Sequence, residues 1–125
     1  MNINFESEKP IYIQIAEEIE DAILSGAFIE QSQVPSTTEI SVTYKINPAT
    51  VLKGINILVD SNILYKKRGL GMFVQDGAAQ SIQNKRKQAF FDEFIINLIN
   101  EAAKLKMEKQ DIINLIERGF QDERN

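Results

Sequence analysis

Residues 36–59 read STTEISVTYKINPATVLKGINILV and hold the start signals of two successive helices. Ser36 and Glu39 have the spacing of a capping box, in which the serine hydroxyl and the glutamate carboxylate each accept a hydrogen bond from a backbone amide of the other residue. Asn47 is a favoured N-cap, and Pro48 suits the first helical position because its missing N–H would have no partner there. The stretch therefore predicts a short helix, a three-residue turn and a longer helix.

The short helix is expected over about residues 37–44, and the longer one runs to about Val59. The longer helix has a core-facing stripe at helical spacing, formed by Val51, Ile55 and Leu58. Gly54 lies within this stripe and indicates the close approach of another element. Lys53 lies on the opposite face, so its side chain is expected to project into solvent.

An amphipathic helix is predicted before this pair, from Pro10 to Leu24. Its apolar residues recur at intervals of three and four: Tyr12, Ile15, Ile19 and Ile23, with Ala16 and Leu24 widening the stripe. Ser25-Gly26 ends the helix, since glycine adopts the left-handed conformation of a helix C-terminus most easily.

A β-hairpin is predicted after the pair, over residues 64–74. Leu64-Tyr65 and Met72-Phe73-Val74 flank the basic, glycine-bearing tip Lys66-Lys67-Arg68-Gly69-Leu70-Gly71, and Asp76-Gly77 closes the unit. The expected fold is therefore mainly α-helical with a small β-hairpin, in the order of a winged helix-turn-helix.

Two further helices are predicted in the tail, over about residues 83–105 and 108–120. The first carries the apolar stripe Phe91, Phe94, Ile95, Leu98, Ala102 and Leu105, and the second carries Ile112, Ile113, Leu115, Ile116 and Phe120. We divide the chain into a winged domain, residues 1–78, and a helical segment, residues 79–125.

The apolar residues of the two tail helices cover more of each helix surface than a single packing contact would bury, which is typical of a protein–protein interface. We expect a homodimer through Phe91, Phe94, Ile95, Leu98, Ala102, Ile112 and Ile116. The alternative is that the tail covers the winged domain within one monomeric core.

The composition excludes several classes of protein. The longest apolar runs are three residues, so no segment could span a membrane, and acidic residues near the start argue against a signal peptide. The chain has no Cys, so it lacks a thiolate nucleophile and a Cys-zinc site, and it has no His, the commonest general base and metal ligand. We therefore expect neither an enzyme nor a cofactor. The carboxylates Asp60 and Asp76 belong to no recognisable catalytic pair.

The net charge is −4, which argues mildly against nucleic-acid binding, but the charges are unevenly distributed. The residues before Ala79 include 6 basic and 10 acidic ones, and the remainder has 8 of each. Four acids of the first part gather at residues 17–21, whereas five of its six bases are Lys45, Lys53 and residues 66–68. One face is therefore expected to be basic and another acidic.

Four separate motifs occur in an order and spacing that resemble the GntR family of bacterial transcription regulators. They are PIYIQIAEEIEDAILSG at 10–26, VPSTTEI at 34–40, INPATV at 46–51 and RGLGMFV at 68–74. The Asn-Pro helix start and the short tail look most like the YtrA-type branch. The resemblance implies a cytoplasmic repressor that binds palindromic double-stranded DNA as a homodimer, often encoded beside ABC transporter genes. A ligand pocket between subunits is compatible with this arrangement, but no residue identifies an effector.

The resemblance also assigns DNA-binding residues, which are Ser36, Thr38, Asn47, Pro48, Ala49, Thr50, Lys53, Arg68, Gly69 and Gly71. We add Lys45, whose charge is expected to act mainly on the DNA backbone. Thr38 stands where many relatives have arginine, so it lacks the fork that reads guanine. Ala49 replaces the asparagine usual in the branch, and Lys53 keeps the charge of the usual arginine without its fork.

Each of these features has a structural alternative. The Ser36–Glu39 spacing is first a helix cap, and a run such as residues 66–68 is often an ordinary solvated edge. A winged helix used for protein–protein contact therefore remains the alternative function. Duplex binding that falls steeply with salt would exclude it, because DNA releases counterions when its phosphates are neutralised.

Overall fold

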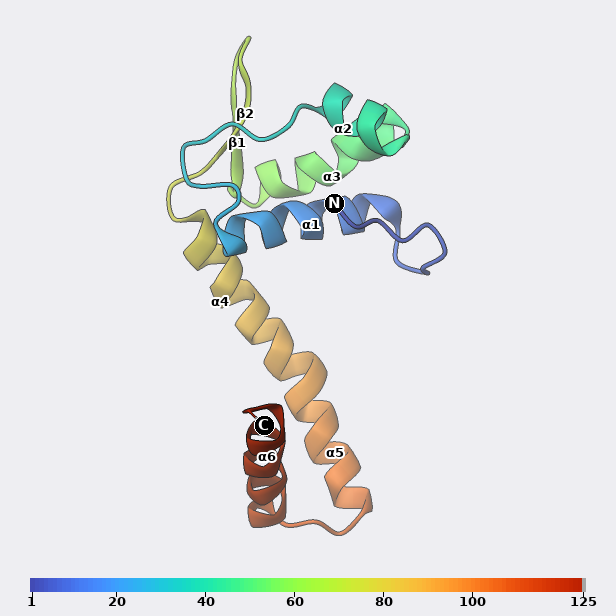
Figure 1. Cartoon of the computed structure of the whole chain (residues 1–125), viewed down its shortest axis with the longest axis vertical. Coiled ribbons are helices and arrows are strands. Elements are labelled where there is room, and N and C mark those ends of the chain that lie inside the picture. Colours follow the sequence, from blue (N-terminus) through green and yellow to red (C-terminus); the bar gives the residue numbers. More distant parts are fainter. Residues whose placement is uncertain (125) are drawn as a thin grey trace. The chain divides into compact units, whose positions relative to one another are not determined.

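The computed structural model describes residues 1–124, which form two compact units that divide between Lys85 and Arg86. The elements in chain order are α1 (Ile11–Ser25), α2 (Thr37–Tyr44), α3 (Pro48–Asp60), β1 (Leu64–Lys67), β2 (Gly71–Val74), α4 (Ala78–Phe90), the π-helical turn η1 (Phe91–Ile95), α5 (Ile96–Lys104) and α6 (Lys109–Arg124) (Figure 1). The predicted fold class, mainly helical with one antiparallel hairpin, is confirmed. None of the helices described up to residue 124 is long and apolar enough to cross a membrane.

One hydrophobic core holds the first unit together, and α1, α2, α3, the hairpin and α4 all contribute to it. Its fully or nearly fully buried side chains include Ile15, Ile19, Ile23, Ile40, Val51, Ile55, Leu58, Leu64, Val74 and Ile82. The stripe predicted on α3 faces this core, and so do Ile15, Ala16, Ile19 and Ile23 of the stripe predicted on α1, whereas Leu24, predicted to widen that stripe, is exposed. Gly26 ends α1 in the left-handed conformation, with a φ of 87°, as its sequence position indicates.

Helices α1 and α3 approach each other closely at Gly54, as predicted. A Cβ atom at this position would lie 2.7 Å from the carbonyl oxygen of Tyr12 and 3.1 Å from Cβ of Ile15. These distances are shorter than ordinary van der Waals contacts. The missing side chain therefore lets the backbone of α1 rest directly on α3.

The hairpin is tied to the linker between α1 and α2. Strands β1 and β2 are antiparallel, with Leu64 opposite Val74 and Lys67 opposite Gly71. The Val34 amide donates to the carbonyl of Met72, and the Val74 amide donates to the carbonyl of Ser32, at 3.0 and 2.9 Å. The linker thus forms one isolated antiparallel bridge to β2, between Gln33 and Phe73, and ties the hairpin to the segment between α1 and α2.

Helix α4 begins at Ala78 and not near residue 83, which corrects the prediction. The Glu30 carboxylate accepts a hydrogen bond from the Gly77 amide at 2.9 Å, at the positive end of this helix. Ala78 and Ile82 are buried in the core, so the first turns of α4 belong to the first unit. The functional division at residues 78 and 79 stays a prediction.

The second unit contains the tail helices, and one of them departs from the predicted regular pattern. The single helix expected over 83–105 is interrupted by the π-helical turn η1, after which α5 ends at Lys104. Helix α6 starts at Lys109 and continues beyond the predicted end at residue 120. An apolar groove of about 420 Å³ runs between α5 and α6, with Leu98, Ala102, Ile112 and Ile116 in its lining.

Candidate nucleic-acid interface

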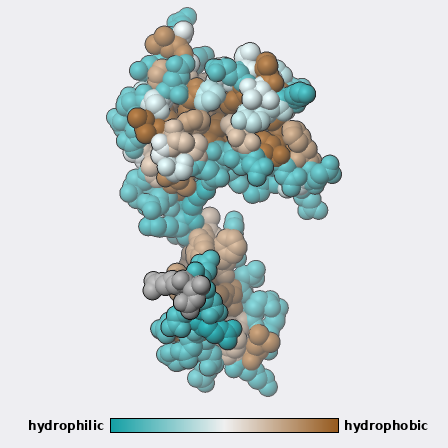
Figure 2. All heavy atoms as spheres, viewed as in Figure 1, coloured by the Kyte–Doolittle hydropathy of each residue, from teal (hydrophilic) through white to brown (hydrophobic). Residues whose placement is uncertain are grey.

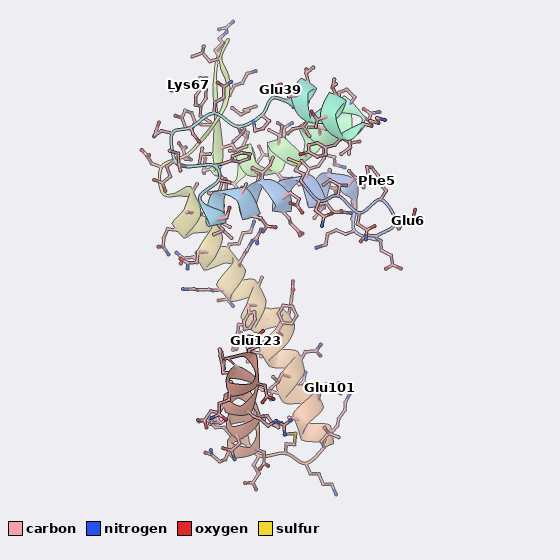
Figure 3. The ribbon with its side chains drawn as sticks, viewed as in Figure 1. Phe5, Glu6, Glu39, Lys67, Glu101 and Glu123 are labelled. Carbon is pink, nitrogen blue, oxygen red and sulfur yellow. The ribbon has the colours of Figure 1, made fainter. Side chains whose placement is uncertain are left out.

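The start of α2 is held by the predicted capping box. The Glu39 amide donates to Oγ of Ser36 at 3.0 Å, and the Ser36 amide donates to Oε1 of Glu39 at 3.2 Å. Figure 3 shows Glu39 at this end of α2. The hydroxyl of Ser36 accepts one bond in the cap and keeps its proton for an acceptor such as a phosphate oxygen. Thr38 is exposed in the first turn.

The start of α3 is held by Asn47, whose Oδ1 accepts a hydrogen bond from the Ala49 amide at 2.8 Å. Pro48 occupies the first helical position, as predicted. Ala49 is exposed and Thr50 half-buried, so this end of the helix is open to solvent. Helix N-termini bind anions well, because their amides are unpaired and the helix dipole is positive there.

Lys45 lies in the turn between the two helices. It adopts the left-handed conformation, with a φ of 55°, and its amide donates to the carbonyl of Ser41 at the end of α2. The side chain is exposed. A lysine in this turn adds positive charge just ahead of the α3 N-terminus.

Lys53 is exposed, as its place on the helix predicts, but its ammonium does not extend freely into solvent. The Nζ atom lies 4.0 Å from the centroid of the Tyr12 ring on α1, in a cation–π contact. This contact corrects the simple outward projection read from the sequence. It fixes a full positive charge at the edge where α1 and α3 meet.

The hairpin tip has the conformation that its glycines permit. Gly69 and Gly71 have φ values of 79° and 126°, which side-chain-bearing residues rarely adopt. A Cβ at Gly71 would also lie 2.7 Å from Nε2 of Gln33, which itself donates to the carbonyl of Leu70 at 2.6 Å. Gln33 thus braces the tip from the linker. The sequence analysis missed this residue, because no local signal marks a contact 37 positions away.

The three cations of the hairpin differ in what they contact. Lys67, labelled on the hairpin in Figure 3, has its Nζ 4.4 Å from the centroid of Phe73. Lys66 and Arg68 are exposed. Lys66 was part of the predicted basic tip but not of the assigned site, and the structure adds it to the exposed cations of the hairpin.

Four of the ten acidic residues of the first unit lie on α1, and two of these four pair with lysines. Nζ of Lys9 is 3.0 Å from the Glu17 carboxylate, and Nζ of Lys85 is 2.8 Å from the buried carboxylate of Glu20. The acidic total therefore reflects α1 more than α2, α3 and the hairpin tip. These parts carry five cations, Lys45, Lys53, Lys66, Lys67 and Arg68, with Glu39 and Asp60 at helix ends.

The tail has a second candidate surface, formed by apolar side chains that one chain leaves uncovered. Figure 2 shows hydrophobic residues at the surface of the tail. Phe94 is 59% exposed, Phe91, Leu98 and Ile116 are also exposed, and Ile95 and Ile112 are half-buried. Ala102 differs from the other predicted interface residues, because it is only 6% exposed in a single chain.

Comparisons with known proteins agree with this arrangement. The family model for bacterial regulatory proteins of the gntR family matches residues 11–74. The HTH-type transcriptional repressor YtrA of Bacillus subtilis (strain 168) is 28% identical over 111 residues, which cover 87% of this chain and 85% of YtrA.

Two solved structures are similar. A transcriptional regulator of the GntR family from Bacteroides thetaiotaomicron has a TM-score of 0.79 and 32% identity, covering 90% of this chain and 98% of that one. The AraR DNA-binding domain in complex with operator ORX1 has a TM-score of 0.55 and 28% identity, covering 59% of this chain and 95% of that one.

Proposed function

Because the chain belongs to the GntR family of bacterial transcription regulators, we propose that it is a repressor that binds a palindromic operator as a homodimer. The observation that carries this proposal is the open N-terminus of α3, with exposed cations in the preceding turn and on the hairpin. Members of this family regulate transcription and are not enzymes. A repressor of this kind acts on the chromosome, in the cytoplasm.

In the proposed complex α3 enters the major groove by its first turns, and the hairpin contacts the flanking backbone. The AraR domain, which has a similar fold, was solved with operator DNA, and this likeness supports DNA binding by the first unit. The Ser36 hydroxyl, the Lys45 ammonium and the first amides of α3 contact phosphates. Arg68 and the glycine backbone of the tip contact the neighbouring phosphates or the minor groove.

The tail supports the proposed homodimer. Several large apolar side chains, including Phe91, Phe94 and Ile116, are exposed in one chain, and contiguous apolar surface of this kind is rare on monomeric proteins. The groove between α5 and α6 offers a second chain a cavity of about 420 Å³ to fill. Ala102 then shapes the floor of the groove from within its own chain. Two-fold symmetry places two readers on two half-sites, which is why the operator should be palindromic.

We also propose that the regulated operon encodes an ABC transporter, on the resemblance to the YtrA-type branch. The genes beside this one and an inverted repeat upstream of them would test this part. Neighbours unrelated to transport, with the repeat elsewhere, would contradict it.

The experiment for the function as a whole is a binding selection on randomised duplexes with the full chain at fixed salt. We expect enrichment of an inverted repeat whose half-sites lie one or more helical turns apart. Enrichment of no sequence, or of a single unrepeated half-site, would contradict the palindromic operator.

A further inference from the structure

The exposed face of α3 carries apolar side chains near its start, beside the polar residues Lys53 and Asn56. Its buried side is set by Val51, Gly54, Ile55 and Leu58, so Ala49 and Leu52 remain on the solvent side near the start. Leu52 is 44% exposed, and Ala49 is exposed as well. The Leu52 side chain is not packed in the hydrophobic core, so core packing does not explain a leucine at this position.

The outer face of α2 is similar. Ile40 is its buried residue, whereas Thr38 and Val42, one turn apart, are exposed, and Val42 is 73% exposed. These two positions provide one hydroxyl and three methyl groups. Both helices of the turn therefore present aliphatic carbon where a DNA-reading domain meets the duplex.

Two of the polar side chains near this face, those of Asn47 and Lys53, already have partners, whereas the Asn56 amide on α3 is exposed. Oδ1 of Asn47 accepts the Ala49 amide, and Nζ of Lys53 lies over the Tyr12 ring. Arg68 is the first arginine of the chain, so neither helix has the two-donor fork that reads guanine. Asn56 is thus the side chain of α3 with an amide for base edges, and the first turns of the helix present apolar groups instead.

We propose that this face selects thymine through its 5-methyl group, with Leu52 and Ala49 as the specificity-determining residues. The inference rests on the proposed function, since it specifies what the operator-binding face reads. In the major groove thymine differs from the other bases by this methyl group, which apolar side chains contact. Leu52 follows Ala49 by three positions, so both side chains lie along one side of the helix.

The expected effect follows from the burial of one methyl group, which corresponds to about a fourfold change in affinity. The probe is a duplex from the binding selection, made with thymine or with 2′-deoxyuridine, which lacks only the methyl group. Each thymine is replaced singly in one half-site and then in both. Replacement at a contacted position should weaken wild-type binding about fourfold, and about sixteenfold when both half-sites change.

Leu52→Ala identifies the side chain that makes the contact. This variant should bind the thymine duplex more weakly than wild type and be indifferent to the replacement that wild type detects. Leu24→Ala is the matched control, because Leu24 is 39% exposed and lies on α1. It should keep both the affinity and the sensitivity of wild type.

The outcomes separate the inference from the proposed function. If wild type binds every deoxyuridine duplex as tightly as the thymine duplex but still prefers the selected sequence, methyl reading is wrong and operator binding stands. If Leu52→Ala keeps the full sensitivity, the assignment to Leu52 is wrong. If no duplex is selected at all, the proposed function fails, and the inference fails with it.

Discussion

Replacing Gly54 by alanine should destabilise the first unit, although alanine is the better helix former. In a helix interior the change from glycine to alanine gains about 1 kcal/mol. At this position, however, the new Cβ would lie 2.7 Å from the Tyr12 carbonyl oxygen and 3.1 Å from Ile15 Cβ and Cγ2. The first of these neighbours is backbone, so α1 itself must shift.

Overpacking of this kind costs about 1–3 kcal/mol, which outweighs the gain in helix propensity. We expect a net loss of about 1 kcal/mol in the free energy of unfolding. In a unit of this size, such a loss corresponds to a decrease of roughly 4–8 °C in the midpoint of thermal unfolding. Because Tyr12 also holds Lys53, the shift of α1 should weaken DNA binding as well.

The assay is urea denaturation followed by circular dichroism, at one protein concentration because dimerisation contributes to stability. Gly119→Ala is the control: Gly119 lies in α6, and a Cβ there would meet no atom within 4 Å. This variant should be neutral or stabilised by up to about 1 kcal/mol. If Gly54→Ala is as stable as Gly119→Ala, the close contact between α1 and α3 is not what requires the glycine.

Three further outcomes are expected. The double variant Phe94→Asp with Leu98→Asp should be monomeric in sedimentation, because burying unpaired carboxylates is costly. The control variant Asn97→Asp should remain dimeric, and a dimeric double variant would refute the tail interface. Lys53→Ala and Arg68→Ala should each weaken duplex binding, with the fold intact by circular dichroism. The control variant Lys104→Ala, in the tail, should keep the affinity of wild type. Unchanged affinity in both Lys53→Ala and Arg68→Ala would remove these residues from the site. Thr38→Arg should tighten binding to all duplexes by adding a charge near phosphate, and should sharpen discrimination between bases only where guanine lies opposite. A sharp base preference of the wild type that disappears in Thr38→Ala would show that threonine itself reads a base.

The helix-turn-helix could be predicted from the sequence because local chemistry determines its limits. The capping box at Ser36 and the Asn47-Pro48 pair act within a single turn, and both helices begin where these signals place them. The resemblance to the GntR family, which rested on four motifs in a fixed order, is confirmed by the family model that matches residues 11–74.

The features that were missed depend on tertiary contacts. Asp76-Gly77 looks like the end of a unit, yet Glu30 supports a helix there from 47 positions away. Helical periodicity places Lys53 in solvent but cannot show that the Tyr12 ring lies beneath it. The apolar residues around Phe91–Ile95 keep the three- and four-residue spacing of a regular α-helix in the sequence, so this pattern gave no sign of the π-helical turn.

The most direct test of DNA binding is the salt dependence of the affinity of wild-type protein for its selected duplex. A plot of the logarithm of affinity against the logarithm of salt concentration should fall linearly, with about 0.9 in slope for each phosphate neutralised. If Lys45, Lys53, Lys66 and Arg68 of both protomers contact phosphate, the slope should reach about −7. Absence of duplex binding, or an affinity unchanged by salt, would contradict the account and favour a winged helix that contacts protein.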